Sequence, residues 1–238
     1  MSAKVYSALI ATALLSTSVS AKQFWSDTSF TLLKGSDYEV GESERNVFTL
    51  EHASGHTWGN IFAFVDRLSP KNSDDKEVYG EVGMTFNLMR QKESFIKDVY
   101  VATQWEYGSS SGAFGMSQDN YLLGAGVNLD IPGSTFFNVN LYRRNNEHGD
   151  ANNQLTLAWA FPFADGFVYD GFMDAVDSTD SSVSSYNITS QLKYDFGQHM
   201  GVEKNKLYAG IEYVYWHNKF GIDGITEKNA NLLLQWHF

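Results

Sequence analysis

The 238-residue chain has no cysteine and only three prolines. The absence of cysteine excludes a disulfide scaffold, a zinc ribbon with thiolate ligands and thiolate catalysis. Positive charge is scarce as well, because 17 Lys and Arg stand against 28 Asp and Glu, which gives a formal net charge of −11. This balance argues against nucleic acid as a partner, since phosphate binding needs a surface rich in Lys and Arg.

Long hydrophobic runs are also missing, and no segment reaches the roughly 20 apolar residues that a membrane-spanning helix needs. The apolar run Val5–Leu15 follows the charged Lys4 and precedes Val19-Ser20-Ala21, whose small residues suit signal peptidase. We therefore expect residues 1–21 to form a secretory signal peptide and residues 22–238 to form the mature domain. The alternative explanation of the run is a first core helix.

Aromatic residues, by contrast, are abundant. They make up 15% of the chain, and 43% of all residues are hydrophobic, yet the mean hydropathy is −0.30. The aromatic content argues against intrinsic disorder. The combination fits a soluble protein, and it also fits a chain in which apolar and polar residues alternate strictly.

The hydrophobic pattern favours the second explanation, because apolar residues recur at every second position along the mature chain. Near the C-terminus, for example, Leu234 and Trp236 alternate with Gln235 and His237. Twelve such segments are predicted as strands, each end being placed within about three residues: 26–35, 45–53, 58–67, 77–90, 97–107, 118–130, 134–145, 152–161, 166–177, 185–196, 206–219 and 227–238.

The connections between these segments alternate between two kinds. Some are short, such as Ile131–Gly133, and others are longer and polar or acidic, such as Ser36–Glu44 and Ser69–Lys76. Hairpins with tight turns at one end and longer loops at the other are typical of outer-membrane barrels. We therefore predict an all-β fold, a transmembrane antiparallel up-and-down β-barrel of about 12 strands in the outer membrane of a Gram-negative bacterium.

A secreted β-sandwich or a soluble barrel is the alternative, because its strands alternate too. Strands of about ten residues and two classes of connection favour the membrane barrel. The terminal Trp236-His237-Phe238 resembles the signal read by the barrel-assembly machinery, which is an expected partner together with the lipid bilayer. Outward aromatics near the strand ends would form interfacial girdles: Trp105, Tyr107, Tyr121, Trp159, Phe161, Tyr194, Phe196, Trp236 and Phe238.

Strand parity assigns the polar rows to the lumen. Asp66 faces lipid only at high cost, so its row is taken as inward, which also turns Phe62 and Phe64 inward. Aromatic rings beside carboxylates suit a pore that stacks planar solutes and binds their hydroxyls or base edges. Alternatively, the rings fill a narrow barrel and the charges pair across it. The pore-lining candidates are Phe62, Phe64, Asp66, Glu81, Glu106, Tyr142, Arg144, Asp170, Asp174, Glu212 and Trp216.

Signals for catalysis or metal binding are weak. Gly108–Gly112 matches the string of a nucleophile elbow, but it lies in a low-complexity loop that no helix follows. His52 and His56 are four residues apart, but no helix is predicted there and no Glu follows the first of them, as metalloprotease chemistry needs. We expect no enzymatic activity, no cofactor and no metal site.

Short motifs along the mature chain resemble the Tsx-like nucleoside-specific channel-forming proteins and the related OmpK-type outer-membrane porins. The segments that carry the resemblance are Leu50–Asp66 (an early hairpin with an aromatic-rich return strand), Lys97–Ala102 (a fifth strand), Tyr121–Pro132 with Asn138–Tyr142 (a central hairpin) and Leu234–Phe238 (the last strand).

This resemblance implies a monomeric twelve-stranded barrel whose narrow pore, lined by aromatic and ionisable residues, passes nucleosides by diffusion. On this basis the predicted function is passive diffusion of nucleosides or similar small solutes through the outer membrane. The alternative is a surface receptor or adhesin whose loops bind phage or host. An outer-membrane hydrolase is a third hypothesis.

Overall fold

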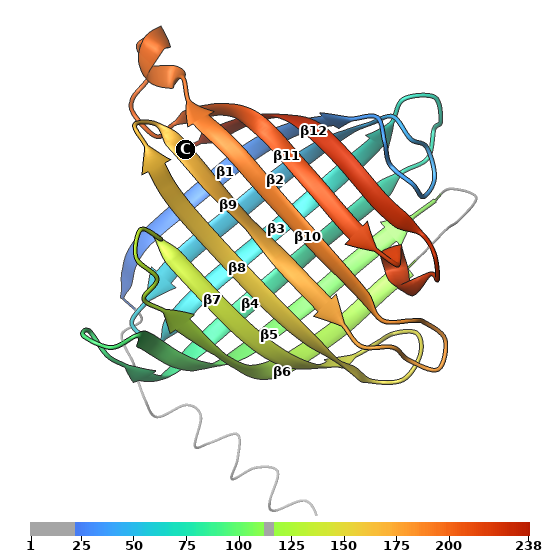
Figure 1. Ribbon diagram of the computed structural model, residues 1–238, viewed down its shortest axis with the longest axis horizontal. Coiled ribbons are helices and arrows are strands. Elements are labelled where there is room, and N and C mark those ends of the chain that lie inside the picture. The colour runs from blue at the N-terminus through green and yellow to red at the C-terminus, as the bar shows by residue number, and fades with distance from the viewer. Residues whose placement is uncertain (1–21, 112–116) are drawn as a thin grey trace, which may run out of the picture.

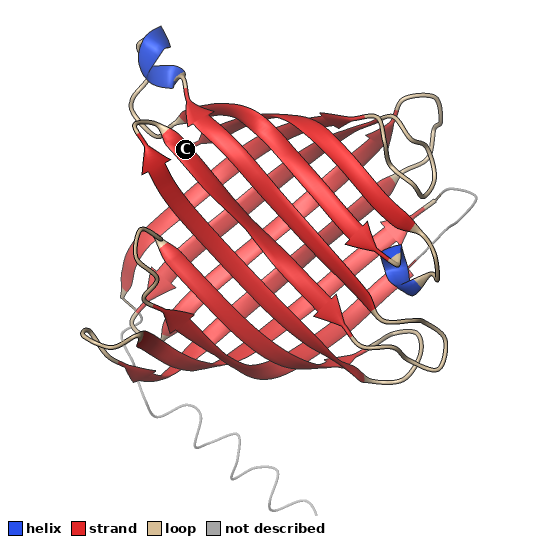
Figure 2. Cartoon of the chain, viewed as in Figure 1, coloured by secondary structure: helices blue, strands red, loops and turns tan. Residues whose placement is uncertain are grey.

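The computed structural model describes residues 22–111 and 117–238, so the predicted signal peptide lies outside the described residues. The described chain is built almost entirely of antiparallel strands (Figures 1 and 2). They are β1 (Gln23–Gly35), β2 (Arg45–His56), β3 (Gly59–Pro70), β4 (Glu77–Arg90), β5 (Ile96–Ser110), β6 (Ser117–Leu129), β7 (Phe136–Asn145), β8 (Asn152–Ala164), β9 (Phe167–Val176), β10 (Ser185–Asp195), β11 (Leu207–His217) and β12 (Thr226–His237). Two short 3-10 helices, η1 (Gly197–Met200) and η2 (Lys219–Gly221), flank β11.

The strands form one closed barrel in which each strand pairs with its neighbours in sequence. The barrel is closed by β1 and β12, where Phe30 lies opposite Trp236 and Leu32 lies opposite Leu234. Closure leaves no strand edge with unpaired N–H and C=O groups. The predicted antiparallel up-and-down barrel of about 12 strands is confirmed, and each predicted segment coincides with a strand to within three residues at either end.

The barrel has an apolar exterior and a polar interior, the reverse of a soluble protein. Outward leucines such as Leu141 and Leu232 are 61% and 67% exposed, whereas the inward Glu227 and Asn229 are 1% and 0% exposed. Polar side chains are rarely buried in water-soluble proteins unless they are paired. Because hydrocarbon makes an exposed leucine favourable, this arrangement is that of a chain whose outer surface faces lipid.

The two ends of the barrel carry different connections. The N-terminal end of β1 and the C-terminal end of β12 both lie at the end of the barrel that carries the short turns (Figure 1). There the backbone N–H of Phe238 donates to the carbonyl of Thr28 (2.9 Å). One connection at that end, between β10 and β11, contains η1. Its return is fixed by Asp195, whose carboxylate accepts the N–H of Asn205 (2.6 Å). No helix among the described residues is long and apolar enough to cross a membrane.

The lipid-facing surface can be tested at Leu141, which lies on the outward row of β7. Replacing an outward residue by arginine near the middle of a bilayer costs about 2–4 kcal/mol. We expect Leu141→Arg to lower the free energy of unfolding in phospholipid vesicles by about that amount, measured by denaturant titration, and Leu141→Ala to lower it much less. If both variants had the same free energy of unfolding, the surface at Leu141 would face water rather than lipid.

Candidate pore-lining site

All eleven candidate residues lie on the inward rows of the barrel. Residues directly opposite each other in a sheet point to the same side, so the register fixes the assignment. Glu81 on β4 lies opposite both Phe64 and Glu106, and Glu212 on β11 lies opposite the buried Asn231. The same register places the rest of the set: Phe62, Asp66, Tyr142, Arg144, Asp170, Asp174 and Trp216. Their contribution to solute binding stays a prediction.

Four of the six candidate carboxylates are held by neutral donors rather than by cations. The hydrogen bonds are Thr49 hydroxyl to Asp66 (2.5 Å), Tyr79 hydroxyl and Gln104 amide to Glu81 (2.5 and 2.8 Å), Thr156 hydroxyl and Gln154 amide to Asp174 (2.5 and 3.2 Å), and Gln191 and Asn231 amides to Glu212 (2.8 and 2.9 Å). Within residues 22–111 and 117–238, no salt bridge includes any of these four carboxylates. They are fixed in position without a cationic partner.

These carboxylates also act on one another across the lumen. Glu81 on β4 lies within electrostatic range of Glu106 and of Asp174 on β9, and Asp66 on β3 lies within range of Glu212 on β11. Neither β4 and β9 nor β3 and β11 are neighbours in the sheet. Carboxyl groups from separate walls therefore converge on one stretch of the lumen.

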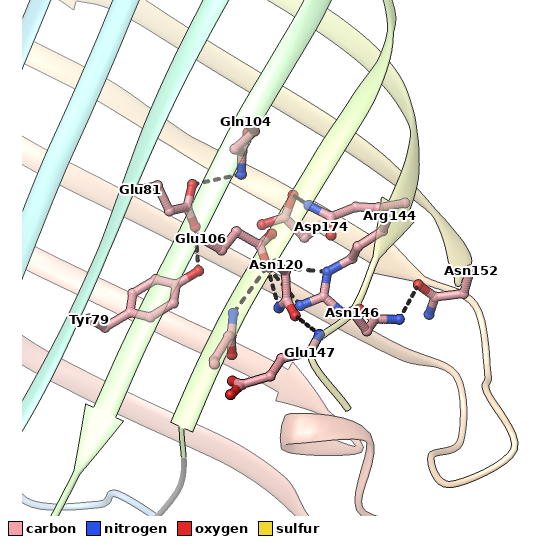
Figure 3. A network of polar contacts seen from close by, with 12 residues as sticks. Tyr79, Glu81, Gln104, Glu106, Asn120, Arg144, Asn146, Glu147, Asn152 and Asp174 are labelled. Carbon is pink, nitrogen blue, oxygen red and sulfur yellow. Dashed lines mark hydrogen bonds and ion pairs between the residues drawn. The ribbon is translucent and has the colours of Figure 1, made fainter. Parts of the chain in front are cut away.

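One buried ion pair stands beside this acidic stretch. Glu106 accepts two hydrogen bonds from Arg144, at 3.1 Å from Nε and 2.7 Å from Nη2, and further bonds from the amides of Asn120 (3.1 Å) and Gln118 (3.0 Å). Figure 3 shows these contacts around Glu106 and, beside them, the separate hydrogen bonds of Glu81 with Tyr79 and Gln104. All four bonds go to the same carboxylate oxygen, Oε2, and the two amide bonds offset part of the cost of burying this ion pair.

A second buried pair lies on the opposite part of the wall. Lys193 on β10 contacts the carboxylate of Asp170 at 2.6 Å and donates to the side-chain oxygen of Gln235 at 2.9 Å. Its ammonium also lies 5.9 Å from the centre of the Tyr208 ring. The charges of Asp170 and Lys193 therefore compensate each other, in agreement with the alternative that some inward charges serve structure.

Tyr142 has a packing role in the structure. It is buried with Tyr100, Ala102 and Leu122 in a small apolar cluster inside the barrel. The Tyr100 hydroxyl, in the same cluster, donates to the side-chain oxygen of Asn140 (2.9 Å). These side chains fill part of the lumen and leave a narrower passage.

The aromatic candidates fall into two groups with different neighbours. Phe64 contacts Phe62 and Tyr79, with ring centres 6.0 and 5.8 Å apart. Trp216 instead contacts Phe220 of η2, with ring centres 4.7 Å apart. Phe62 and Phe64 therefore lie beside Glu81, whereas Trp216 belongs to the loop end of the barrel.

The loop end contains a feature that the sequence analysis did not predict: residues 36–44, between β1 and β2, fold into the lumen. The Tyr38 hydroxyl donates to Asn231 (3.1 Å), and the backbone N–H groups of residues 37 and 39 donate to Asn229 (3.2 Å) and Glu227 (3.0 Å). Burial raises the pKa of Tyr38 well above its ordinary range. One feature of the sequence could have indicated this insertion. In the half of β12 that lies near the loops, every inward residue is polar.

Two cations hold this inserted loop. Arg45 pairs with Glu77 (2.6 Å), donates to the carbonyls of Glu42 and Val40, and lies 5.0 Å from the Tyr38 ring centre. Lys219 pairs with Glu227 at 2.5 Å. It also lies 4.9 Å from the Trp216 ring centre. Burial lowers the pKa of Lys219.

A cavity of about 340 Å³ remains beside the loop at the mouth, and its lining includes Arg45, Glu77, Tyr79, Gln118 and Phe220.

Comparison with known proteins identifies the fold. No protein-family model matches the sequence, and no curated protein matches it significantly. Among solved structures, the chain is similar to the KdgM porin, with a TM-score of 0.54 and 9% identity over 90% of this chain and 99% of that one. It is also similar to the NanC porin, with a TM-score of 0.54 and 12% identity over 87% and 98% of the two chains.

A further structure, of the KdgM porin in complex with disordered oligogalacturonate, gives a TM-score of 0.53 and 9% identity. Likeness at this level of identity shows a porin-like barrel fold. It does not extend to the nucleoside specificity implied by the Tsx-like resemblance, which stays a prediction.

The Glu106–Arg144 pair gives a direct test of the network. Removing one partner of a buried ion pair leaves an uncompensated charge and costs on the order of 3–5 kcal/mol. We expect Arg144→Gln to lower the free energy of unfolding in vesicles by about that amount. The double variant Glu106→Gln with Arg144→Gln should recover most of the loss. Equal destabilisation by the single and double variants would show that the pair is not the cause.

Proposed function

We propose that the protein is a passive channel of the outer membrane for small polar solutes that are neutral or positively charged. The observation that carries the proposal is the set of inward carboxylates, Asp66, Glu81, Asp174 and Glu212, which are held by neutral donors and have no salt-bridge partner among the described residues. A lumen with this charge lowers the energy of a cation and raises that of an anion.

The porin-like fold supports a channel, and the lumen chemistry supports a cargo different from that of one structural neighbour. The KdgM porin was captured with oligogalacturonate, which is an acidic oligosaccharide. A polyanion of this kind would meet carboxyl groups that have no cationic partner in the described part of the present barrel. Passage of a solute needs no covalent chemistry, so the proposal includes no enzymatic activity and no cofactor.

Within this class, we propose nucleosides as the preferred solutes. A nucleoside has a planar base, a sugar with hydroxyl groups and no negative charge. The Phe62–Phe64–Tyr79 wall offers aromatic faces for the base, and Glu81 beside it can accept hydrogen bonds from sugar hydroxyls. The inserted loop and the Tyr142 cluster narrow the lumen, which brings a passing solute close to these side chains.

Charge selectivity tests the channel itself. In a planar bilayer with a KCl gradient, we expect a reversal potential that reports cation preference. The double variant Glu81→Gln with Asp174→Asn removes two lumen charges and should shift the reversal potential towards zero. Asp119→Asn is the matched control, because Asp119 lies on the outward row, where it binds the Trp105 indole N–H (2.8 Å). Anion preference in the unmodified protein would contradict the proposal.

Nucleoside preference is tested separately with the same bilayers. We expect adenosine or thymidine to reduce the KCl current at concentrations where ribose alone does not. Stacking of a base on an aromatic side chain contributes about 1–3 kcal/mol. Phe64→Ala should therefore raise the half-blocking concentration about fivefold or more, whereas Phe48→Ala, on the outward row of β2, should leave it unchanged. A current unaffected by nucleosides would refute the nucleoside claim and leave the channel intact.

A further inference from the structure

Glu51 on β2 carries a lumen-facing carboxyl group that the sequence analysis did not single out. It lies opposite Ser29 of β1 and opposite Phe64 of β3. Residues directly opposite each other in a sheet point to the same side, and Ser29 is buried inside the barrel. Glu51 therefore stands in the same inward row as Phe64. It is only half-buried, so it remains accessible from the lumen.

The neighbours of Glu51 on the barrel wall give its carboxyl group no hydrogen bond. On the same face of β2, the Thr49 hydroxyl donates to Asp66 at 2.5 Å, and Ala53 has no polar side-chain atom. On β3, the opposite residue Phe64 has none either. Over residues 22–111 and 117–238, the Glu51 carboxyl group takes part in no hydrogen bond and in no salt bridge.

Glu51 differs in this respect from the acid on the other side of the Phe64 ring. Glu81, which lies opposite Phe64 on β4, accepts a hydrogen bond from Tyr79 at Oε1 (2.5 Å) and one from Gln104 at Oε2 (2.8 Å). Both oxygens of Glu51 are left to the contents of the lumen. Polar groups in a low-dielectric enclosure are costly when they have no partner, so a solute that supplies donors to Glu51 is favoured.

Four titratable groups lie within electrostatic range of Glu51, and they are paired with one another. Lys193 contacts Asp170 at 2.6 Å, and His237 contacts Asp27 at 2.8 Å. Lys193 and Asp170 belong to β10 and β9, which are not neighbours of β2 in the sheet. Neither Lys193 nor His237 bonds to Glu51, so the protein leaves this acceptor open on a solute path that other charged groups border.

The chemistry of an open carboxylate selects the kind of donor. Its two oxygens match a planar group that presents two parallel N–H donors, because such a pair forms two hydrogen bonds at once. Among the common bases of nucleosides, guanine alone has this arrangement, with its ring N1–H beside its exocyclic amino group. Opposite side chains in a sheet start about 4.5–5.5 Å apart, so a base stacked on Phe64 has its edge within reach of Glu51.

We propose that Glu51 determines the specificity of the channel and makes guanine nucleosides its preferred solutes. The base stacks on Phe64, and its N1–H and amino group donate to the two oxygens of Glu51. The sugar hydroxyls then lie towards Glu81, on the other side of the ring. This inference rests on the proposed nucleoside function and adds to it the base that is recognised.

The experiment compares guanosine with inosine as blockers of the KCl current through the mature protein in planar bilayers. Recordings at about pH 8 favour the ionised form of a carboxyl group. Inosine differs from guanosine only in lacking the exocyclic amino group. Because a hydrogen bond to a charged acceptor is among the stronger ones, we expect the half-blocking concentration of guanosine to be about tenfold lower than that of inosine.

Two variants assign this difference to Glu51. Glu51→Gln keeps the size of the side chain but turns one acceptor into a donor, so it should raise the half-blocking concentration of guanosine about tenfold, to the value for inosine. The value for adenosine should not change, which would show that the pore is intact. Glu93→Gln is the matched control, because it makes the same chemical change at an exposed residue between β4 and β5, and it should leave all values unchanged.

The outcomes separate this inference from the proposed function. Equal block of the unmodified protein by guanosine and inosine would overturn the role of Glu51 and leave nucleoside passage standing. A guanosine preference that persists in Glu51→Gln would overturn it as well, since the base would then be recognised elsewhere. If adenosine, inosine and guanosine all left the current unchanged, the nucleoside function itself would be refuted, and the inference with it.

Discussion

The pairing of β1 with β12 is the interaction on which the rest of the structure depends. Hydrocarbon offers no hydrogen-bond partner, so a sheet with free edges would leave a row of N–H and C=O groups unsatisfied at a cost of several kcal/mol each. Closure removes both edges at once. Once the sheet is closed, every side chain points either to lipid or to the lumen. The apolar exterior and the polar interior are both consequences of this division.

The interior then meets a second constraint, because charges enclosed by low-dielectric walls are costly unless they are bonded. The chain meets it in two ways. Glu106 and Asp170 are paired with Arg144 and Lys193. The four carboxylates on β3, β4, β9 and β11 are stabilised by hydroxyls and amides instead, which fix their position without a cationic partner. The proposed solute contacts are with these four acids, whereas the two ion pairs belong to the structure of the wall.

The strands were predictable from the sequence because a period of two is a local signal, and the parity of the rows followed from it. Even Phe62 and Phe64 were assigned correctly to the lumen, since the cost of a lipid-facing Asp66 outweighs that of two inward rings. The insertion of residues 36–44 was not predictable. Its partners on β12 are between 188 and 193 residues away, and nothing local to the loop specifies them. Row parity tells which side of the sheet a residue faces, but not its height along the barrel axis. The separation of Trp216 from Phe64 depends on that height, so parity did not predict it.

The inserted loop also has a consequence for the order of assembly. Asn229, Asn231 and Glu227, which receive it, are on the last strand of the chain. The loop that follows the first strand therefore has no docking surface until β12 has formed beside β1. The contacts that hold the loop in the lumen therefore require the first and last strands of the chain to lie side by side, so correct seating of the loop depends on the same register that closes the barrel.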